Sequence, residues 1–325
     1  MRLLNKAIQA GAIVGTLGLV TAAQAASWDM PTPYSDKIFH TANIIEFAKD
    51  VEAATNGALM IKVHSAGSLF KHPEIKNAVR GGQVPIGEFF LSRLSNENAA
   101  FGADSQPFLA TNYEEAAKLW AAQKPVVSKL LDEQGLMALF SVPWPGQSLY
   151  SKKPINSVGD LKGLKFRAYN ATLETFAKMA GAAPTQVESP DIPQAFATGR
   201  VEAMITSPST GVSSKAWDFV SQFTDIQAWL PKNIVVVNKK AFRKLDKGVQ
   251  DAIMAAAAKA EKRGWEMSRK ETDDKIETLK ANGMTIVKPS DELMSGLKDI
   301  GDKMLTDWKA SSGADGDAIL KAYAH

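Results

Sequence analysis

The residues in this sequence with the clearest chemical potential follow two short predicted strands between positions 154 and 211. Arg167 ends a strand predicted over 164–167, and Ser207 follows a strand predicted over 201–205, with two helical runs between them. In open α/β sheets, ligands bind at the edge where the strands end. A guanidinium offers a planar fork of N–H donors that matches a carboxylate. This unit therefore predicts a small-carboxylate site at Arg167; the alternative is that Arg167 pairs with a neighbouring Asp or Glu, as many surface arginines do.

Several other residues are candidates for the same site, and each also has a purely structural interpretation. Trp144 could stack on a ligand ring or pack in a hinge. Phe89 and Phe90 are consecutive in a predicted strand, so one should face the cleft and the other the core. Ser207 could donate its hydroxyl to a carboxylate or cap a helix that begins near Val212.

Three further residues complete the predicted site. Tyr169 lies two positions after Arg167, Trp229 could line the cleft roof or pack in the core, and His40 could face the cleft or serve as an exposed cap of the first helix. The full set of predicted ligand-binding residues is Arg167, Trp144, Ser207, Phe90, Phe89, Tyr169, Trp229 and His40.

The composition of this set bears on the ligand. It is rich in aromatic side chains and holds one cation, Arg167, which favours a monocarboxylate with an aromatic or apolar body. The alternatives are a C4-dicarboxylate or a 2-oxo acid. A dicarboxylate would call for a second cation, which Lys71, Arg93 or Lys152 could supply if they fold inward.

The composition also argues against most enzyme classes. The chain has 325 residues, a formal net charge of +3, four histidines and no cysteine. No nucleophile elbow, His-Glu-x-x-His helix, P-loop or dinucleotide fingerprint is present, and no basic stripe suggests nucleic acid. His64 and His72 are too far apart for a local metal-ligand pair and are predicted to lie in surface loops. We therefore expect no enzymatic activity, cofactor or metal, with a carboxylate-based exported hydrolase as the alternative of another class.

Residues 1–25 have the pattern of a secretory signal peptide. Arg2 and Lys6 precede a small, apolar run over 7–22, and Ala23-Gln24-Ala25 provides a cleavage site before Ala26. The run is short for a membrane span, although a retained anchor is the alternative. The mature protein is predicted to be exported, to the periplasm in a bacterial host.

The elements that must position the site alternate between strands and helices. Predicted strands over 27–34, 59–64 and 84–90 flank helices over 39–54 and 74–80, a pattern typical of a parallel sheet with helices on its faces. The later elements are a helix over 114–134, strands over 137–143 and 234–238, a helix over 249–281, and a helical segment over 291–323 with a break at 313–316.

The chain is predicted to form two α/β lobes. The Trp144-Pro145-Gly146 segment interrupts a strand, and the chain is expected to cross between lobes there. The helix over 249–281 would be roughly 50 Å long, which exceeds one lobe, so it should pack along both; Gly264 could bend it. Lobe I is assigned to 26–145 and 235–277, and lobe II to 146–234 and 278–325.

The whole mature chain resembles the periplasmic solute receptors of tripartite ATP-independent periplasmic (TRAP) transporters, of the DctP type. The resemblance rests on the order of several short motifs, namely Thr55-Asn56-Gly57, Gly81-Gly82-Gln83-Val84, Gln106-Pro107-Phe108-Leu109, Asp160-Leu161-Lys162-Gly163-Leu164-Lys165-Phe166-Arg167, Gly199-Arg200-Val201-Glu202-Ala203 and the long helix after Leu245.

The resemblance implies a fold and a function. The fold would be that of a two-lobed periplasmic binding protein (type II-like), with a hinged ligand cleft and a long helix that spans both lobes. Such a receptor closes around an organic anion and delivers it, as a monomer, to a membrane permease driven by an ion gradient. Arg167 matches the arginine that pairs with the ligand carboxylate. A second ligand-facing position falls near Ser207-Pro208, where the family often has a polar or acidic residue.

Overall fold

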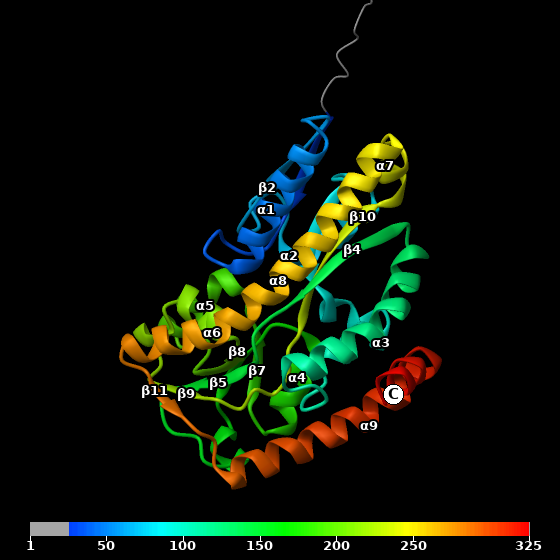
Figure 1. Cartoon of the computed structure of the whole chain (residues 1–325). Coiled ribbons are helices and arrows are strands. Elements are labelled where there is room, and N and C mark those ends of the chain that lie inside the picture. The colour runs from blue at the N-terminus through cyan, green and yellow to red at the C-terminus, as the bar shows by residue number, and fades with distance from the viewer. Residues whose placement is uncertain (1–25, 325) are drawn as a thin grey trace, which may run out of the picture.

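Two groups of strands build the protein, a computed structural model that describes residues 26–324 (Figure 1). The predicted signal peptide lies outside the described residues. In the first group, β1 (Ala26–Pro31) pairs in parallel with β2 (Leu59–His64), while β10 (Lys232–Asn238) lies between β3 (Ile86–Phe90) and β4 (Leu136–Pro143). The expected parallel sheet of the first three strands forms only between β1 and β2, since β3 pairs antiparallel with β10.

The second group is a six-stranded mixed sheet in the order β11-β9-β5-β8-β6-β7. Its strands are β5 (Ser148–Ser151), β6 (Lys165–Ala168), β7 (Ala183–Gln186), β8 (Ala203–Thr206), β9 (Gln222–Thr224) and β11 (Thr285–Val287). β6 is parallel to both β7 and β8, so the ends of these strands meet at one edge of the sheet. β7 is a strand that the sequence does not predict, and it lies between the two helical runs of the predicted unit.

Helices cover both groups of strands. Their bounds are α1 (Phe39–Ala54), α2 (His72–Arg80), α3 (Tyr113–Asp132), α4 (Ala171–Met179), α5 (Ile192–Ala197), α6 (Pro208–Ser213) and α7 (Lys239–Arg243), with 3-10 segments η1 (Leu91–Asn96) and η2 (Ala99–Ser105). The apolar residues of α1 lie on one face, and Phe47 and Val51 are fully buried in the core of the first group. Burial of side chains of this size contributes about 1.5–3 kcal/mol each. Phe166 and Phe176 do the same in the second group. The protein is therefore two-lobed, with separate apolar clusters packed on each group of strands.

Two chain segments that pass between the lobes lie side by side. The segment from β4 to β5 contains Trp144 and Gln147, and the segment from β9 to β10 contains Trp229 and Pro231. The backbone N–H of Trp144 donates to the Pro231 carbonyl (2.7 Å), and that of Gln147 donates to the Trp229 carbonyl (3.0 Å). These hydrogen bonds join the two crossing segments into one structural unit between the lobes.

The long helix α8 (Lys247–Ala281) runs across the whole molecule, from α7 to β11 (Figure 1). It contacts α1 and β4 of the first lobe and α6 and β11 of the second, as predicted. Gly264 lies against β4 and α1 with little space to spare. A Cβ atom there would lie 2.4 Å from a methyl of Val142 and 2.7 Å from the amide nitrogen of Asn43.

This close approach gives the first testable prediction. Gly264→Ala should lower the free energy of unfolding by about 1–3 kcal/mol, because overpacking at a rigid contact outweighs the roughly 1 kcal/mol gain of alanine in a helix. Chemical denaturation measures the change. Gly248→Ala in the first turn of α8 is the matched control, since a Cβ there meets nothing within 4 Å. Equal stability of the two variants would contradict the packing argument.

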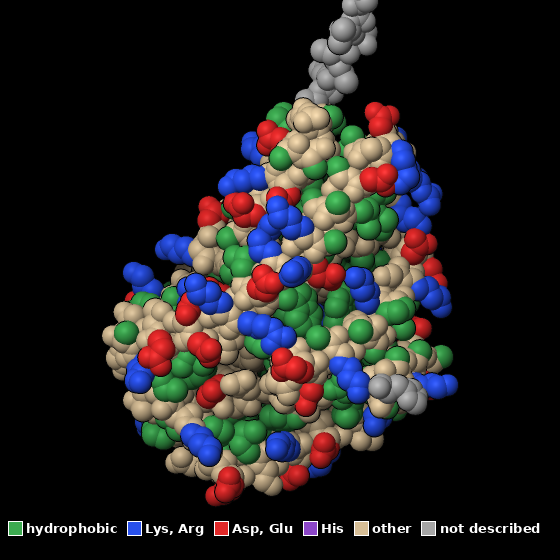
Figure 2. All heavy atoms as spheres, in the orientation of Figure 1, with side chains coloured by type: hydrophobic (Ala, Val, Ile, Leu, Met, Phe, Trp, Pro, Cys, Tyr) green, Lys and Arg blue, Asp and Glu red, His purple; other side chains and the backbone are tan. Residues whose placement is uncertain are grey.

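The C-terminal helix α9 (Asp291–Ala324) also contacts both lobes. It is interrupted at Gly313, where φ is 53° and ψ is −143°, as the predicted break requires. Its first half packs near α4, and its second half packs on α3 and η2, where the indole of Trp308 donates to the Ala99 carbonyl (2.7 Å). Lysine, arginine, aspartate and glutamate side chains are interspersed over the face shown in Figure 2. Between residues 26 and 324, no helix has both the length and the apolar character needed to cross a membrane.

Candidate functional site

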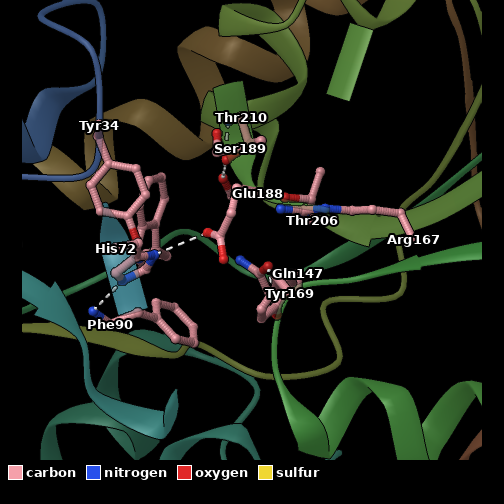
Figure 3. Close-up of a pocket in the computed structure, with 12 residues that line it drawn as sticks. Tyr34, His72, Phe90, Gln147, Arg167, Tyr169, Glu188, Ser189, Thr206 and Thr210 are labelled. Carbon is pink, nitrogen blue, oxygen red and sulfur yellow. Dashed lines mark hydrogen bonds and ion pairs between the residues drawn. The ribbon is translucent and has the colours of Figure 1, made fainter. Parts of the chain in front are cut away.

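A small cavity, partly open to solvent, lies between the lobes (Figure 3). Most of the residues that line it lie at or just after strand ends in both lobes or in the paired crossing segments, while His72 begins α2 and Thr210 lies in α6. They are Tyr34, His72, Phe90, Trp144, Gln147, Arg167, Tyr169, Glu188, Ser189, Thr206, Ser207 and Thr210.

Arg167 lies in β6 and is only 3% exposed. Its Nε donates to the Val187 carbonyl (3.0 Å), but its buried Nη1 has no hydrogen-bond partner. Among residues 26–324, no carboxylate oxygen lies within 4.0 Å of the guanidinium, so the interpretation that it pairs with a neighbouring Asp or Glu has no counterpart. Burial lowers the pKa of Arg167 to about 10, which leaves the side chain charged at neutral pH. A buried, unpaired cation is costly, and an anionic ligand would offset that cost.

The aromatic ring of Tyr169 packs against the Arg167 guanidinium. The Arg167 carbon Cζ lies 5.0 Å from the centre of the Tyr169 ring, within cation–π range. The Tyr169 hydroxyl accepts a hydrogen bond from the Trp229 indole (3.0 Å) and donates to the Gln147 side-chain oxygen (3.1 Å). Trp229 does not line the cavity, but its hydrogen bond fixes the position of the Tyr169 ring, which does.

Trp144 and Tyr34 form the wall on the first lobe. Both donate to one oxygen, the side-chain oxygen of Asn233, at 2.9 and 3.3 Å respectively. The Asn233 amide donates in turn to Glu88 (3.0 Å), whose second oxygen accepts from Thr32 (2.6 Å). Because an indole nitrogen can only donate, this network fixes which end of the Asn233 amide faces the cavity wall. Two buried residues thus orient two aromatic rings of the site.

His40 lies behind this wall rather than in the cavity. It is 1% exposed, and its ring centre lies 4.4 Å from that of Trp144. The interpretation of His40 as an exposed cap is therefore wrong. Its Nδ1 lies 3.6 Å from Glu88, but burial lowers the pKa of His40 well below its usual value, so the contact joins a neutral ring to a carboxyl group. Burial also raises the pKa of Glu88, to about 7.

Glu188 follows β7, and its carboxylate joins the two lobes inside the cavity. It accepts a hydrogen bond from His72 Nδ1 (3.2 Å) and one from Arg93 Nη1 (2.8 Å), both from the first lobe. Partial burial raises the pKa of Glu188, but the bond from His72 and the charges of Arg93 and Arg167 outweigh that effect and hold it at about 2. Glu188 is therefore ionised at any ordinary pH.

Glu188 is a site residue that the sequence does not single out, and His72 is one that it places elsewhere. The prediction that His72 lies in a surface loop is wrong, because it begins α2 and its side chain is buried. The available signal for Glu188 was its place just after the short segment Ala183–Gln186, which forms β7 beside β6. Arg93, considered as a possible second cation, is already engaged by Glu188 and by the Tyr169 carbonyl (3.2 Å).

Ser207 has the structural role that was its alternative interpretation. Its hydroxyl accepts from the Thr210 backbone N–H (3.1 Å) and donates to the Thr210 hydroxyl (3.1 Å), and so caps α6. The helix begins at Pro208 rather than near Val212. Ser207 and Thr210 nevertheless line the cavity, and with Thr206 they form its hydroxyl-rich side.

Five of the eight predicted site residues line the cavity, namely Arg167, Trp144, Ser207, Phe90 and Tyr169. Phe89, Trp229 and His40 do not line it. Phe89 faces the core while Phe90 faces the cavity, as strand alternation predicts. Within the described part of the chain, no group of three or more His, Asp or Glu side chains is arranged to hold a metal ion.

Comparison with known proteins agrees with this architecture. The chain matches the bacterial extracellular solute-binding protein family 7 over residues 32–310. A Bordetella pertussis extracytoplasmic solute receptor, DctP7, which binds pyroglutamic acid, is 45% identical, with a TM-score of 0.92 over 93% of this chain and 100% of that one. A marine metagenome TRAP solute-binding protein with co-purified pyroglutamate is 44% identical, with a TM-score of 0.91 over 93% of this chain and 99% of that one.

Among curated proteins, a solute-binding protein of Albidiferax ferrireducens is 28% identical and aligns over 88% of this chain and 85% of its own length. The sequence motifs predict a solute receptor rather than an enzyme, and the comparisons confirm that prediction, because the family is one of solute-binding proteins. The match over residues 32–310 shows that this chain belongs to the bacterial extracellular solute-binding protein family 7, the family of TRAP solute receptors.

Proposed function

We propose that this protein is the periplasmic receptor of a TRAP transporter for a small cyclic monocarboxylate, with pyroglutamate as the first candidate. The observation that carries the proposal is the buried Arg167 guanidinium, whose Nη1 has no partner among the described residues. A ligand carboxylate would supply two acceptor oxygens to it. Each hydrogen bond between charged groups contributes roughly 1.5–3 kcal/mol.

The shape and walls of the cavity support a compact ring. The cavity is small and is bounded by the aromatic rings of Tyr34, Phe90, Trp144 and Tyr169. Relatives at 44–45% identity bind pyroglutamic acid, which is a five-membered ring with one carboxylate. An aromatic monocarboxylate such as benzoate or mandelate shares the carboxylate and the flat body, and it is the second candidate.

The proposed transport step follows from the hinge. The ligand binds to Arg167 when the lobes are apart, and closure brings Trp144 and Phe90 of the first lobe onto its ring. Because the ligand contacts both lobes only in the closed state, it shifts the population towards closure. The closed, monomeric receptor then delivers the anion to its membrane permease in the periplasm. The predicted signal peptide over 1–25 would direct the export.

Native mass spectrometry and calorimetry test this function together. The protein purified without added ligand should carry the mass of one pyroglutamic acid molecule, which is lost on partial unfolding and regained on titration. The refolded, ligand-free protein should then be titrated with pyroglutamate, benzoate, mandelate, pyruvate and succinate. Micromolar or tighter binding of pyroglutamate, with the acid recovered unchanged, supports the proposal. Binding of succinate or pyruvate in preference to the ring acids would overturn it.

A further inference from the structure

Glu188 has a hydrogen-bonding role that is fixed before any ligand arrives. The backbone N–H of Phe90 donates to His72 Nε2 (3.1 Å), so this nitrogen must carry a lone pair. The other ring nitrogen, Nδ1, therefore holds the proton and donates it to Glu188 Oε2. Burial lowers the pKa of His72, which agrees with a neutral ring. The N–H of a backbone amide thus selects the tautomer that holds Glu188 in place.

The carboxylate keeps spare acceptor capacity on the side of the cavity. An ionised carboxylate has about four lone-pair positions, and His72 and Arg93 use two of them. The Glu188 side chain remains 36% exposed and lines the cavity. It has no proton to donate. Any ligand group that faces it must therefore be a hydrogen-bond donor.

Arg167 and Glu188 point into the same cavity (Figure 3). They do not form an ion pair with each other. The ion-pair partners of Glu188 among the described residues are His72 and Arg93. The cavity therefore presents a cation and a separate, fixed anion to a ligand between them. A molecule with a carboxylate at one position and an N–H donor beside it matches both groups.

We propose that Glu188 is a specificity-determining residue that accepts a hydrogen bond from an N–H group of the bound acid and rejects acids with a second carboxylate. The inference rests on the proposed function, because it assumes a carboxylate at Arg167. It assigns the second polar contact of the site to the end of β7 rather than to Ser207, whose hydroxyl is used in the cap of α6. Since His72 and Arg93 belong to the first lobe, Glu188 is aimed at the ligand only when the lobes are together.

The decisive experiment compares two ligands of the same shape. Pyroglutamate has a ring N–H, and 5-oxotetrahydrofuran-2-carboxylate has a ring oxygen in its place. The wild-type protein should bind the lactam more tightly than the lactone by roughly 10- to 150-fold. This ratio of dissociation constants corresponds to the loss of one hydrogen bond to a charged group. In Glu188→Gln, the side-chain amide can donate to the lactone oxygen, so the ratio should fall towards one. Isothermal titration calorimetry of the full mature chain gives both constants.

Two further arms sharpen the result. Glutarate should bind the wild-type protein far more weakly than pyroglutamate and should gain affinity in Glu188→Gln, because the repulsion between carboxylates is removed. The matched control is Glu97→Gln, because Glu97 pairs with Lys76 outside the cavity, and its lactam-to-lactone ratio should equal that of the wild type.

The ratio also separates this role from a merely structural one. If Glu188 only held the lobes together, Glu188→Gln would weaken both ligands by the same factor and leave the ratio unchanged, which would overturn the proposal. A wild-type protein that binds the lactone as tightly as the lactam would do the same. In either case an undiminished dependence on Arg167 would leave the proposed function standing. Failure of the wild-type protein to bind any ring acid would instead remove that function itself.

Discussion

Replacing Arg167 with alanine is expected to weaken binding of the ligand carboxylate by roughly 10²- to 10⁴-fold. The guanidinium can form two parallel hydrogen bonds to a carboxylate, each worth about 1.5–3 kcal/mol, and their sum converts to this range of dissociation constants. The interaction takes place in a site where Arg167 is 3% exposed, so water competes weakly for it. Calorimetry and ligand-induced thermal stabilisation both measure the loss.

The same substitution should leave the ligand-free protein folded. Arg167 has no carboxylate partner within 4.0 Å among the described residues, so its removal breaks no ion pair and relieves the desolvation of a buried charge. Arg167→Lys is the informative control, since it keeps the charge but loses the planar fork, and it should bind with intermediate affinity. An alanine variant that binds within fivefold of the wild type would contradict the assignment of Arg167.

The second large effect concerns stability and pH. Burial raises the pKa of Glu88 from an ordinary value near 4.5 to about 7 in the folded protein. A group with a raised folded pKa contributes stability that is fully present below its unfolded pKa and is lost as the pH rises through the folded one. Glu88 should therefore lower the free energy of unfolding by roughly 2–3 kcal/mol between pH 5 and pH 8.

Glu88→Gln should remove this loss and raise the stability at pH 8. A glutamine keeps the geometry, because its oxygen can accept from Asn233 and its amide can donate to the Thr32 hydroxyl, replacing both bonds of the carboxyl group. Chemical denaturation at several pH values measures the difference. Glu46→Gln is the control, since Glu46 lies on the exposed face of α1 and should leave the wild-type slope unchanged. Parallel pH profiles for the wild type and Glu88→Gln would contradict the prediction.

Much of the fold was accessible from local patterns. The helix bounds at α1, the long α8, the break at Gly313 and the crossing at Trp144 follow from periodicity, chain length and turn residues, which act over a few positions. Errors arose where the pairing partner was remote. β3 follows β2 in the chain but pairs antiparallel with β10, whose residues lie about 145 positions away, as the bond between Glu88 and Asn233 shows.

The candidate site divides in the same way. Arg167 was accessible because a guanidinium at a strand end has one obvious chemical use, and Phe90 because side chains alternate along a strand. The sequence alone thus determined the two-lobed fold and the family, and it singled out Arg167 as the candidate cationic anchor. Only the tertiary structure decided that Arg167 would be buried with no hydrogen-bond partner for its Nη1 among the described residues, and that His72 would hold Glu188 in the cavity. The contact between His72 and Glu188 joins residues 116 positions apart in the chain. Burial sets the protonation states of these groups, and no local sequence pattern encodes it.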